Sequence, residues 1–502
     1  MDFHVSLAGR GDLSARIYRQ IVDAILDGRL RPGERLPPSR ELAGRLEVSR
    51  NTVALAYERM AAEGFLEGRA GAGTFVTQKA LPGRPAAYGG ASPRRRKAGA
   101  VAPRRLWQEL TTPVGGDGGA PPGYDFRVGA PDPRLFPLAT WRRLVAGELR
   151  PSVVHAAAYG DPSGHPGLRA AISRYIGISR SVRAEPDDML VTQGAQQALD
   201  LVGRVLIEPG DHVAVEEPGY PPARLLFRSL GARVTGVPVD AEGLDVAAIP
   251  ATARLVYVTP SHQFPLGTPM SPERRAALLD WAERRGATVI EDDYDSEFRF
   301  GGRPLEPLHS LDRAGRVVYI GSFSKTLLPT LRAGFLVAPA SLLPALRRAR
   351  QLADWHGDVV TQSALARFID EGMLGRQIRK ATREYAVRRD LILTTLRRDF
   401  AGLLQVMPSA AGLHLCARLV PYADEDADLG AVIARAREAG VAVENLAAYC
   451  GERPARHGLV LGYGGIPAER VEEGLRRLLA CFPPRRTRPE PSAGRDADIR
   501  PT

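Results

Sequence analysis

RVVYIGSFSKTLLPTLRAGFLVAP, residues 316–339, opens with an apolar run of strand character and then reaches Lys325. The hydroxyls of Ser322 and Ser324 precede this lysine, and the guanidinium of Arg332 follows it. A lysine amine can form an imine with an aldehyde, while hydroxyl and guanidinium donors suit a phosphate dianion. The stretch therefore predicts a site for a phosphate-bearing aldehyde cofactor, although S-x-x-K alone also occurs in serine enzymes.

Lysine is scarce in this chain, which narrows the choice of a reactive amine. Apart from Lys325 it occurs only at Lys79, Lys97 and Lys380, and nearly all other positive charge is arginine. Whether Lys325 binds a cofactor therefore depends on whether other stretches of the sequence supply groups that suit the rest of the cofactor.

A second stretch, TVIEDDYDSEF at 288–298, supplies groups that suit a pyridine ring. Its first residues predict a buried strand, with Asp292 at the carboxyl end and Tyr294 two residues further on. A carboxylate there can keep a pyridine nitrogen protonated, and a phenol can bond the ring oxygen. Taken alone, an acidic run after a strand is more often a metal-ligand set or a loop, so the interpretation depends on Lys325.

Two further stretches suggest the rest of a binding cup. DMLVTQGAQQALDLV, 188–202, predicts a strand, a turn at Gly194 and a helix, so the backbone N–H groups of Ala195 and Gln196 would face an anion. VAVEEPGYPPARLLF, 213–227, puts Tyr220 at the end of another strand, where its ring either stacks on the pyridine or packs in the core.

Residues 1–78 have a different pattern, of short helices. We expect a first helix with Ser14 as its N-cap, an inward face carrying Ile17, Ile21 and Ile25, and an end at Gly28. A second helix is expected to be capped by Ser39, and a third by Ser49.

The third helix would present its first turn to the outside. Val53, Tyr57 and Met60 have core spacing, which leaves Arg50, Asn51 and Thr52 exposed. After it, FLEG and TFV predict two strands, and residues 69–73 between them would form a basic wing tip. The alternative is a small helical domain with arginines on its surface.

The whole series resembles the GntR-type winged helix: G-x-L-x-P-G-x-x-L-P-x-S-R-x-L-A, V-S-R-x-T-V, an E-G-F/L turn and a G-x-G-T-F/Y-V wing. That resemblance implies binding to a double-stranded DNA operator. The expected DNA-binding residues are Arg40, Ser49, Arg50, Asn51, Thr52, Arg69, Gly71, Gly73 and Thr74.

The later motifs, preceded by AYGDPSGHPGLRAAI at 158–172, resemble fold-type I aminotransferases over residues 124–480. The resemblance implies pyridoxal 5'-phosphate (PLP) on Lys325 as an internal aldimine, and a homodimer in which Tyr159 lies near the partner's phosphate. A winged helix fused to such a domain resembles the MocR/GabR regulators, as do TPSHQFPLG at 259–267 and EDDYDSEF. These regulators respond to PLP itself or to an amino compound, so we expect one of these as the effector.

The expected fold class is thus an N-terminal winged helix-turn-helix joined to an α/β domain with a mostly parallel sheet between helices and a small C-terminal α+β subdomain. The expected boundaries are 1–78 for the DNA-binding domain, 79–123 for a flexible basic linker, 124–482 for the PLP-binding domain with its subdomain from about 370, and 483–502 for a disordered tail.

Two departures from the aminotransferase pattern bear on activity. Where N-P-x-G usually places an asparagine on the ring oxygen, this chain has residues 261–267, SHQFPLG; His262 or Gln263 either takes that role or packs behind the site. In HGLVLGYGG, 457–465, Val460 aligns with the arginine that binds the substrate α-carboxylate. Arg224, Arg418 and Arg456 are candidate substitutes for that anchor.

Without the anchor, efficient transamination is not expected, and the sequence favours PLP as effector. The alternatives are a working PLP-dependent aminotransferase with an accessory DNA-binding domain, and a DNA-binding protein with an inactive aminotransferase shell.

Bulk properties agree with a multi-domain regulator. The 502 residues exceed one ordinary core, and the formal net charge of +11 suits an anionic partner without identifying one. The three cysteines, Cys416, Cys450 and Cys481, form neither a disulfide framework nor a metal motif, and no apolar run is long enough for a membrane span. We expect a cytoplasmic protein with no metal.

Overall fold

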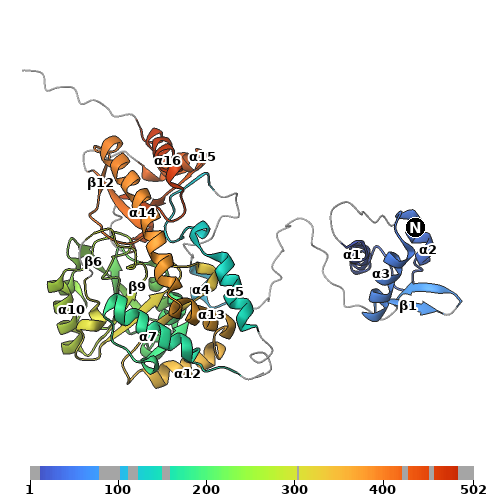
Figure 1. The fold of residues 1–502 in the computed structure, drawn as a ribbon, viewed down its shortest axis with the longest axis horizontal. Coiled ribbons are helices and arrows are strands. Elements are labelled where there is room, and N and C mark those ends of the chain that lie inside the picture. Colours follow the sequence, from blue (N-terminus) through green and yellow to red (C-terminus); the bar gives the residue numbers. More distant parts are fainter. Residues whose placement is uncertain are drawn as a thin grey trace, which may run out of the picture. The chain divides into compact units, whose positions relative to one another are not determined.

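The computed structural model describes residues 12–69, 71–77, 102–110, 122–149, 159–301, 305–420, 428–451 and 457–483. Tertiary contacts divide the chain into two compact units, Met1–Ala102 and Pro103–Thr502 (Figure 1). Most of the expected linker, 79–123, and nearly all of the expected tail, 483–502, lie outside the described residues, so those boundaries stay predictions.

The N-terminal unit consists of three helices and a two-stranded sheet: α1 Leu13–Leu26, α2 Ser39–Arg45, α3 Arg50–Ala62, β1 Leu66–Arg69 and β2 Gly73–Val76. Its core contains the predicted inward residues, among them Ile17, Ile21, Val53 and Met60. The prediction of Ser14 as the first N-cap is wrong, because the Asp12 carboxylate accepts a hydrogen bond from the Ser14 N–H and the helix begins at Leu13.

The cap of α3 is as predicted, and it fixes the first turn of that helix. Ser49 Oγ accepts from the Thr52 N–H at 3.1 Å, and the two hydroxyls are 2.7 Å apart. Strands β1 and β2 pair antiparallel from Leu66 opposite Val76 to Arg69 opposite Gly73, which gives the expected wing.

The second unit is organised around an eight-stranded sheet with the order β4-β11-β10-β9-β8-β5-β6-β7. The neighbouring pairs from β10 through β9, β8 and β5 to β6 are parallel, while β4, β11 and β7 are antiparallel to their neighbours. The strands are β4 Met189–Thr192, β5 His212–Glu217, β6 Arg233–Asp240, β7 Gly243–Leu244, β8 Ala253–Val258, β9 Thr288–Asp293, β10 Val317–Ser322 and β11 Gly334–Val337.

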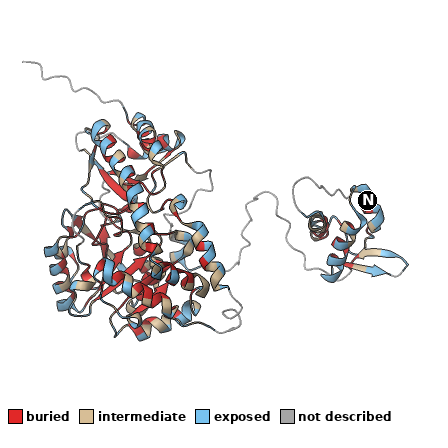
Figure 2. Cartoon of the chain, in the orientation of Figure 1, coloured by how far each residue is buried: buried red, intermediate tan, exposed pale blue. Residues whose placement is uncertain are grey.

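Helices pack on both faces of this sheet, and buried positions concentrate on the strands and the inner sides of the helices (Figure 2). Near-continuous apolar strands such as Val317–Ile320 are what burial on both faces requires. The helices of this part are α4 Arg105–Glu109, α5 Leu138–Glu148, α7 Pro166–Arg180, α8 Ala195–Leu206, α9 Pro221–Ser229, α10 Pro272–Arg285, α11 Leu308–Leu311, α12 Leu343–Asp354 and α13 Val359–Asp370.

The C-terminal part of this unit is an α+β subdomain, which begins along the long helix α14, Met373–Asp399. An antiparallel sheet of order β12-β13-β16-β15 packs with helices α15 and α16, and a short parallel pair joins β14 to β3. The remaining elements are β3 Tyr124–Asp125, β12 Leu404–Val406, β13 His414–Leu419, α15 Leu429–Glu438, β14 Val441–Ala442, β15 Glu444–Asn445, β16 Gly458–Gly462 and α16 Ala468–Ala480. None of the helices in the described ranges combines the length and apolar character that a membrane crossing needs.

Candidate functional site

A cavity of about 880 Å³ opens where the parallel strands β5, β8, β9 and β10 end. Carboxyl ends of parallel strands meet at one edge of a sheet, and ligands of open α/β sheets bind there. Residues that the sequence analysis singled out on four separate stretches therefore share one wall. The cavity brings together Ala195, Gln196, Tyr220, Asp292, Tyr294, Ser322, Ser324, Lys325 and Arg332.

Lys325 lies just beyond the end of β10, and its amine faces this cavity. Nζ donates a hydrogen bond of 2.5 Å to the Gly129 carbonyl oxygen. Desolvation lowers the pKa of the Lys325 amine below its usual value, against the opposing attraction of Asp295 and Asp292. A depressed pKa leaves more of the amine unprotonated, which is what imine formation needs.

Asp292 is buried on β9, and only one of its two carboxylate oxygens accepts a hydrogen bond from the described residues. Tyr257 donates a hydrogen bond of 2.8 Å to Oδ2, while Oδ1 is buried without a partner among the described residues. Burial raises the pKa of this carboxyl to about 7. A buried carboxylate oxygen without a partner costs free energy, so this site suits a ligand that supplies an N–H.

The predicted phosphate cup is assembled at the N-terminus of α8. Gly194, with a φ of +81°, is the N-cap, and a Cβ there would lie 3.0 Å from Arg332 Nη2. Arg332 bonds the Gln193 carbonyl oxygen, and Ser322 Oγ accepts from the Ser324 N–H at 3.1 Å. The unsatisfied N–H groups of the first turn, a guanidinium and two hydroxyls thus face the same end of the cavity.

Two tyrosines line the cavity beside this cup. Tyr220 meets Phe264 edge to face at 5.7 Å, and burial raises the pKa of its phenol to about 12. Tyr294 donates a hydrogen bond of 3.0 Å to the His262 carbonyl oxygen, and burial raises the pKa of this phenol well above its usual value. Both phenols are therefore protonated at neutral pH, and the single O–H of Tyr294 is already donated to His262.

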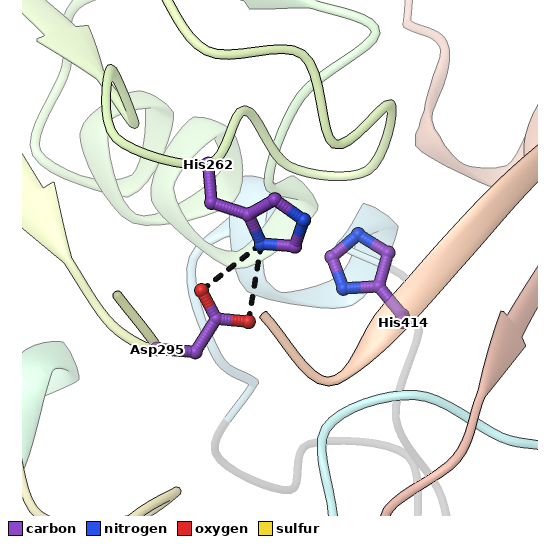
Figure 3. A group of neighbouring side chains, drawn as sticks. All are labelled: His262, Asp295 and His414. Carbon is purple, nitrogen blue, oxygen red and sulfur yellow. Dashed lines mark hydrogen bonds and ion pairs between the residues drawn. The ribbon is translucent and has the colours of Figure 1, made fainter. Parts of the chain in front are cut away.

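His262 and Gln263, the candidates for the missing asparagine, are not on the cavity wall. His262 is buried, and its Nδ1 lies 3.0 Å from Asp295 Oδ1 (Figure 3). Its Nε2 lies 3.1 Å from Ser409 Oγ. The Gln263 amide donates to the Pro218 carbonyl oxygen at 2.9 Å. Phe264 lines the cavity instead, directly before Pro265, where N-P-x-G has its asparagine.

Tyr159 does not line the cavity of its own chain. Its side chain is on the surface, 75% exposed, and its ring stacks on Trp355 with a centroid distance of 4.5 Å. A role at a partner's phosphate stays a prediction.

The aligned position of the carboxylate-binding arginine is filled by an apolar side chain. Val460 on β16 is fully buried, opposite Cys416 on one side and Glu444 on the other. Of the substitutes, Arg224 is ion-paired with Glu217, Arg418 is exposed on β13, and neither lines the cavity. Arg456 lies outside the described residues.

Several cavity residues could not be found from the sequence, because they come from segments that precede and follow the motif-bearing stretches. Gly129, His414 and Glu444 line the cavity, yet each lies more than 80 residues away from Lys325 in sequence and none belongs to a recognisable motif. The pairing of β3 with β14 and the sheet containing β13 and β15 bring these segments to the site. Contacts between segments so distant in sequence cannot be recognised from any local sequence pattern.

The predicted DNA-reading residues lie on the outside of the N-terminal unit. Arg40, Ser49, Arg50 and Asn51 are exposed, and Thr52 is half-buried through its bond to Ser49. In the wing, Arg69 pairs with Glu67 and lies over the Phe75 ring, while Gly71 and Gly73 are exposed and Thr74 is half-buried.

Arg35 is an additional cation at the wing. A Cβ at Gly73 would lie 2.9 Å from Arg35 Nε, so the guanidinium packs directly over this glycine. An antiparallel bridge between Arg35 and Phe75 brings Arg35 to the wing. This contact could not be predicted from the sequence.

Comparison with known proteins agrees with both units. Residues 13–76 match the family "Bacterial regulatory proteins, gntR family", and residues 151–448 match "Aminotransferase class I and II". The chain is 37% identical over 478 residues to a probable rhizopine catabolism regulatory protein, MocR, from Rhizobium meliloti, with 93% of each chain covered. The chain belongs to the MocR-type regulators.

A second MocR-type relative is the pyridoxine biosynthesis transcriptional regulator PdxR from Corynebacterium glutamicum, 32% identical over 93% of this chain and 94% of that protein. Among solved structures, an archaeal alanine:glyoxylate aminotransferase is 27% identical, with a TM-score of 0.67, covering 72% of this chain and 91% of that one. This MocR-type chain is thus a transcriptional regulator with a GntR winged helix and an aminotransferase-like domain of a PLP-dependent fold family.

Proposed function

We propose that this regulator binds PLP covalently through Lys325 and that the bound cofactor takes part in effector sensing. The observation that carries the proposal is the coincidence, in one cavity, of a desolvated lysine amine, a buried carboxylate oxygen without a partner and a helix N-terminus covered by Arg332. These three features fit the aldehyde, the pyridine nitrogen and the phosphate of PLP in turn.

Each residue has a distinct task in this proposal. PLP supplies an electrophilic carbon that amino compounds can reach. Asp292 holds a proton on the pyridine nitrogen, and Tyr294 hydrogen-bonds the ring oxygen. Ser322, Ser324, Arg332 and the N–H groups of Ala195 and Gln196 hold the phosphate, Gly194 leaves room for Arg332, and Tyr220 covers the ring.

For DNA, we propose that α3 enters the major groove with Arg50 and Asn51 at its exposed start, and that the wing contacts phosphates or the minor groove. A homodimer would place two such units on paired half-sites. The effector, PLP or an amino compound, must bind one arrangement of the dimer more tightly than another to change operator affinity.

Replacing the lysine tests the cofactor site. Lys325→Ala is expected to abolish the visible absorbance of bound cofactor after dialysis with PLP, and to remove any effect of PLP on operator affinity. Lys380→Ala is the matched control, because Lys380 is exposed on α14 and away from the cavity. Equal cofactor absorbance in the two variants would contradict the proposal, and equal operator affinity with and without PLP would remove PLP as the direct signal.

The retained Lys325 and Asp292 also favour a second function, that of a working aminotransferase. Sustained turnover of an amino donor with an oxo-acid acceptor would support it. Absence of turnover across a broad panel would reject it, as the apolar Val460 leads us to expect.

A further inference from the structure

The end of the cavity away from the phosphate cup has its own chemistry. Its wall is formed by segments 125–130, 413–414 and 444–449, from the subdomain and the chain that pairs with it. The polar side chains there are Asp125, Arg127, His414, Glu444, Asn445 and Tyr449. An amino compound that reaches toward Lys325 must present the rest of its structure to this set.

Arg127 is the one guanidinium on this wall within the described part of the chain, and it is already bound to a carboxylate. Its Nε and Nη2 donate to Asp125 Oδ1 and Oδ2 at 2.9 and 2.6 Å, a two-pronged pairing that satisfies both groups. A ligand carboxylate would have to displace Asp125 to use it.

Glu444 brings a negative charge to the same wall. It is opposite Val460 in the pairing of β15 with β16, so both side chains lie on the sheet face that borders the cavity. Oε1 accepts from the Val128 N–H at 3.0 Å, and Oε2 accepts from the Tyr449 hydroxyl. No cationic side chain in the described ranges forms an ion pair with Glu444, and each oxygen keeps capacity for a further donor.

His414 adds a second acceptor. Burial lowers the pKa of its imidazole to about 3, so the ring is neutral. Nε2 lies 3.1 Å from the Pro265 carbonyl oxygen, which can only accept, so Nε2 carries the ring proton. Nδ1 therefore has a lone pair and no hydrogen, on a residue that lines the cavity beside His262 and Asp295 (Figure 3).

We propose that the effector is a primary amine without a carboxylate, whose remote part offers hydroxyl or ammonium donors to Glu444 and His414. A carboxylate in this position would meet Glu444 as a like charge and the His414 lone pair as a second repulsive contact. This inference rests on the proposed PLP site at Lys325, because it concerns an amine that shares the cavity with the bound cofactor.

Three compounds of matched length test the preference: 1,4-diaminobutane, 4-amino-1-butanol and 4-aminobutanoate. Calorimetric titration of the PLP-loaded full chain should show both the diamine and the amino alcohol binding about tenfold or more tightly than the amino acid. The diamine exceeding the alcohol would indicate an ammonium at the remote end, and the reverse order a hydroxyl; both orders support the proposal. Tighter or equal binding of 4-aminobutanoate, or binding of none of the three, would overturn it.

An isosteric substitution locates the cause. Glu444→Gln should weaken diamine binding about tenfold and reduce the gap between diamine and amino acid. Glu438→Gln, an exposed acid on α15, is the control and should change neither affinity. An unchanged diamine affinity in Glu444→Gln would overturn the role of Glu444. Loss of the PLP absorbance in the unsubstituted chain would instead indicate failure of the cofactor proposal itself, so the two failures are distinguishable.

Discussion

Asp292 is a buried carboxyl whose ionisation is shifted by its surroundings in the folded protein. Its pKa is raised to about 7 by burial, whereas an unfolded aspartate titrates near 4. Between these two values the folded cofactor-free protein binds a proton that the unfolded chain has released. Its free energy of unfolding therefore falls as pH rises through this window, by up to about 1.4 kcal/mol per pH unit for one group.

Asp292→Asn removes this group's contribution. For the cofactor-free chain, urea unfolding at pH 5 and pH 6.5 should show a smaller loss of stability for Asp292→Asn than for the natural sequence. Asp390→Asn on the exposed side of α14 serves as the control and should keep the natural slope. Identical pH slopes for all three chains would mean that Asp292 is ionised in the folded state throughout this range.

At this scale the sequence predicted residues at or just beyond the carboxyl ends of apolar strands. Lys325 and Asp292 could be placed because β10 and β9 are continuous buried runs whose ends can be located from the residues. The sequence left open whether His262 takes the asparagine's role or packs behind the site, because the direction of its side chain depends on Asp295 and Ser409, which are distant in sequence. Glu444 and His414 could not be predicted, since only the folded subdomain brings them to the cavity.

Among the helices and strands, α3 gives the most specific prediction about DNA contacts. Arg50 at its start should contact a phosphate, and Asn51 a base edge. Arg50→Ala is then expected to weaken all DNA binding uniformly and to reduce the salt dependence, the slope of log K against log salt, by about 1. Asn51→Ala should instead cost about 1–3 kcal/mol of discrimination between operator and unrelated DNA.

Fluorescence anisotropy at several salt concentrations would separate these two effects. Arg19→Ala on the exposed side of α1 is the matched control, and its binding should equal that of the natural sequence. If Asn51→Ala lost affinity equally for operator and unrelated DNA, the base-reading role would have to move to another residue of the unit, such as those in the wing.

Of the three serines predicted as helix N-caps, only Ser49 is one: Asp12 replaces Ser14, and α2 has Pro38 at its N-cap position with no side-chain cap, so Ser39 is its first helical residue. Ser49 was predicted correctly because V-S-R places it between a turn and an amphipathic run, whereas Ser14 competed with Asp12, whose carboxylate reaches the same N–H groups. The parallel strands could be inferred from their apolar runs. The antiparallel direction of β11 beside β10 could not, because the periodicity of the residues does not indicate the direction in which a strand runs.

At the scale of the whole molecule, the two units have separate cores, and each should fold and bind its ligand without the other. A protease site inserted near residue 90 would separate them after folding. We expect the cleaved protein to keep cofactor absorbance and to bind DNA more weakly, because the two units on paired half-sites are no longer linked, while an effector no longer changes operator affinity. Anisotropy before and after cleavage would measure this, with the uncut inserted chain as the control. An effector response that survives cleavage would place the coupling in direct contact between units.

The pairing of Val460 with Glu444 across β15 and β16 also limits how this protein can diverge. A single substitution of Val460 by arginine would place the guanidinium opposite Glu444, which would form an ion pair with it. A single substitution of Glu444 by a neutral residue would still leave the site without a cation for a carboxylate. Under the proposed effector preference, two changes must therefore occur together before an amino acid is recognised, and neither single change is sufficient. Such a two-step barrier would keep a lineage of sensors apart from the amino-acid enzymes that share its architecture.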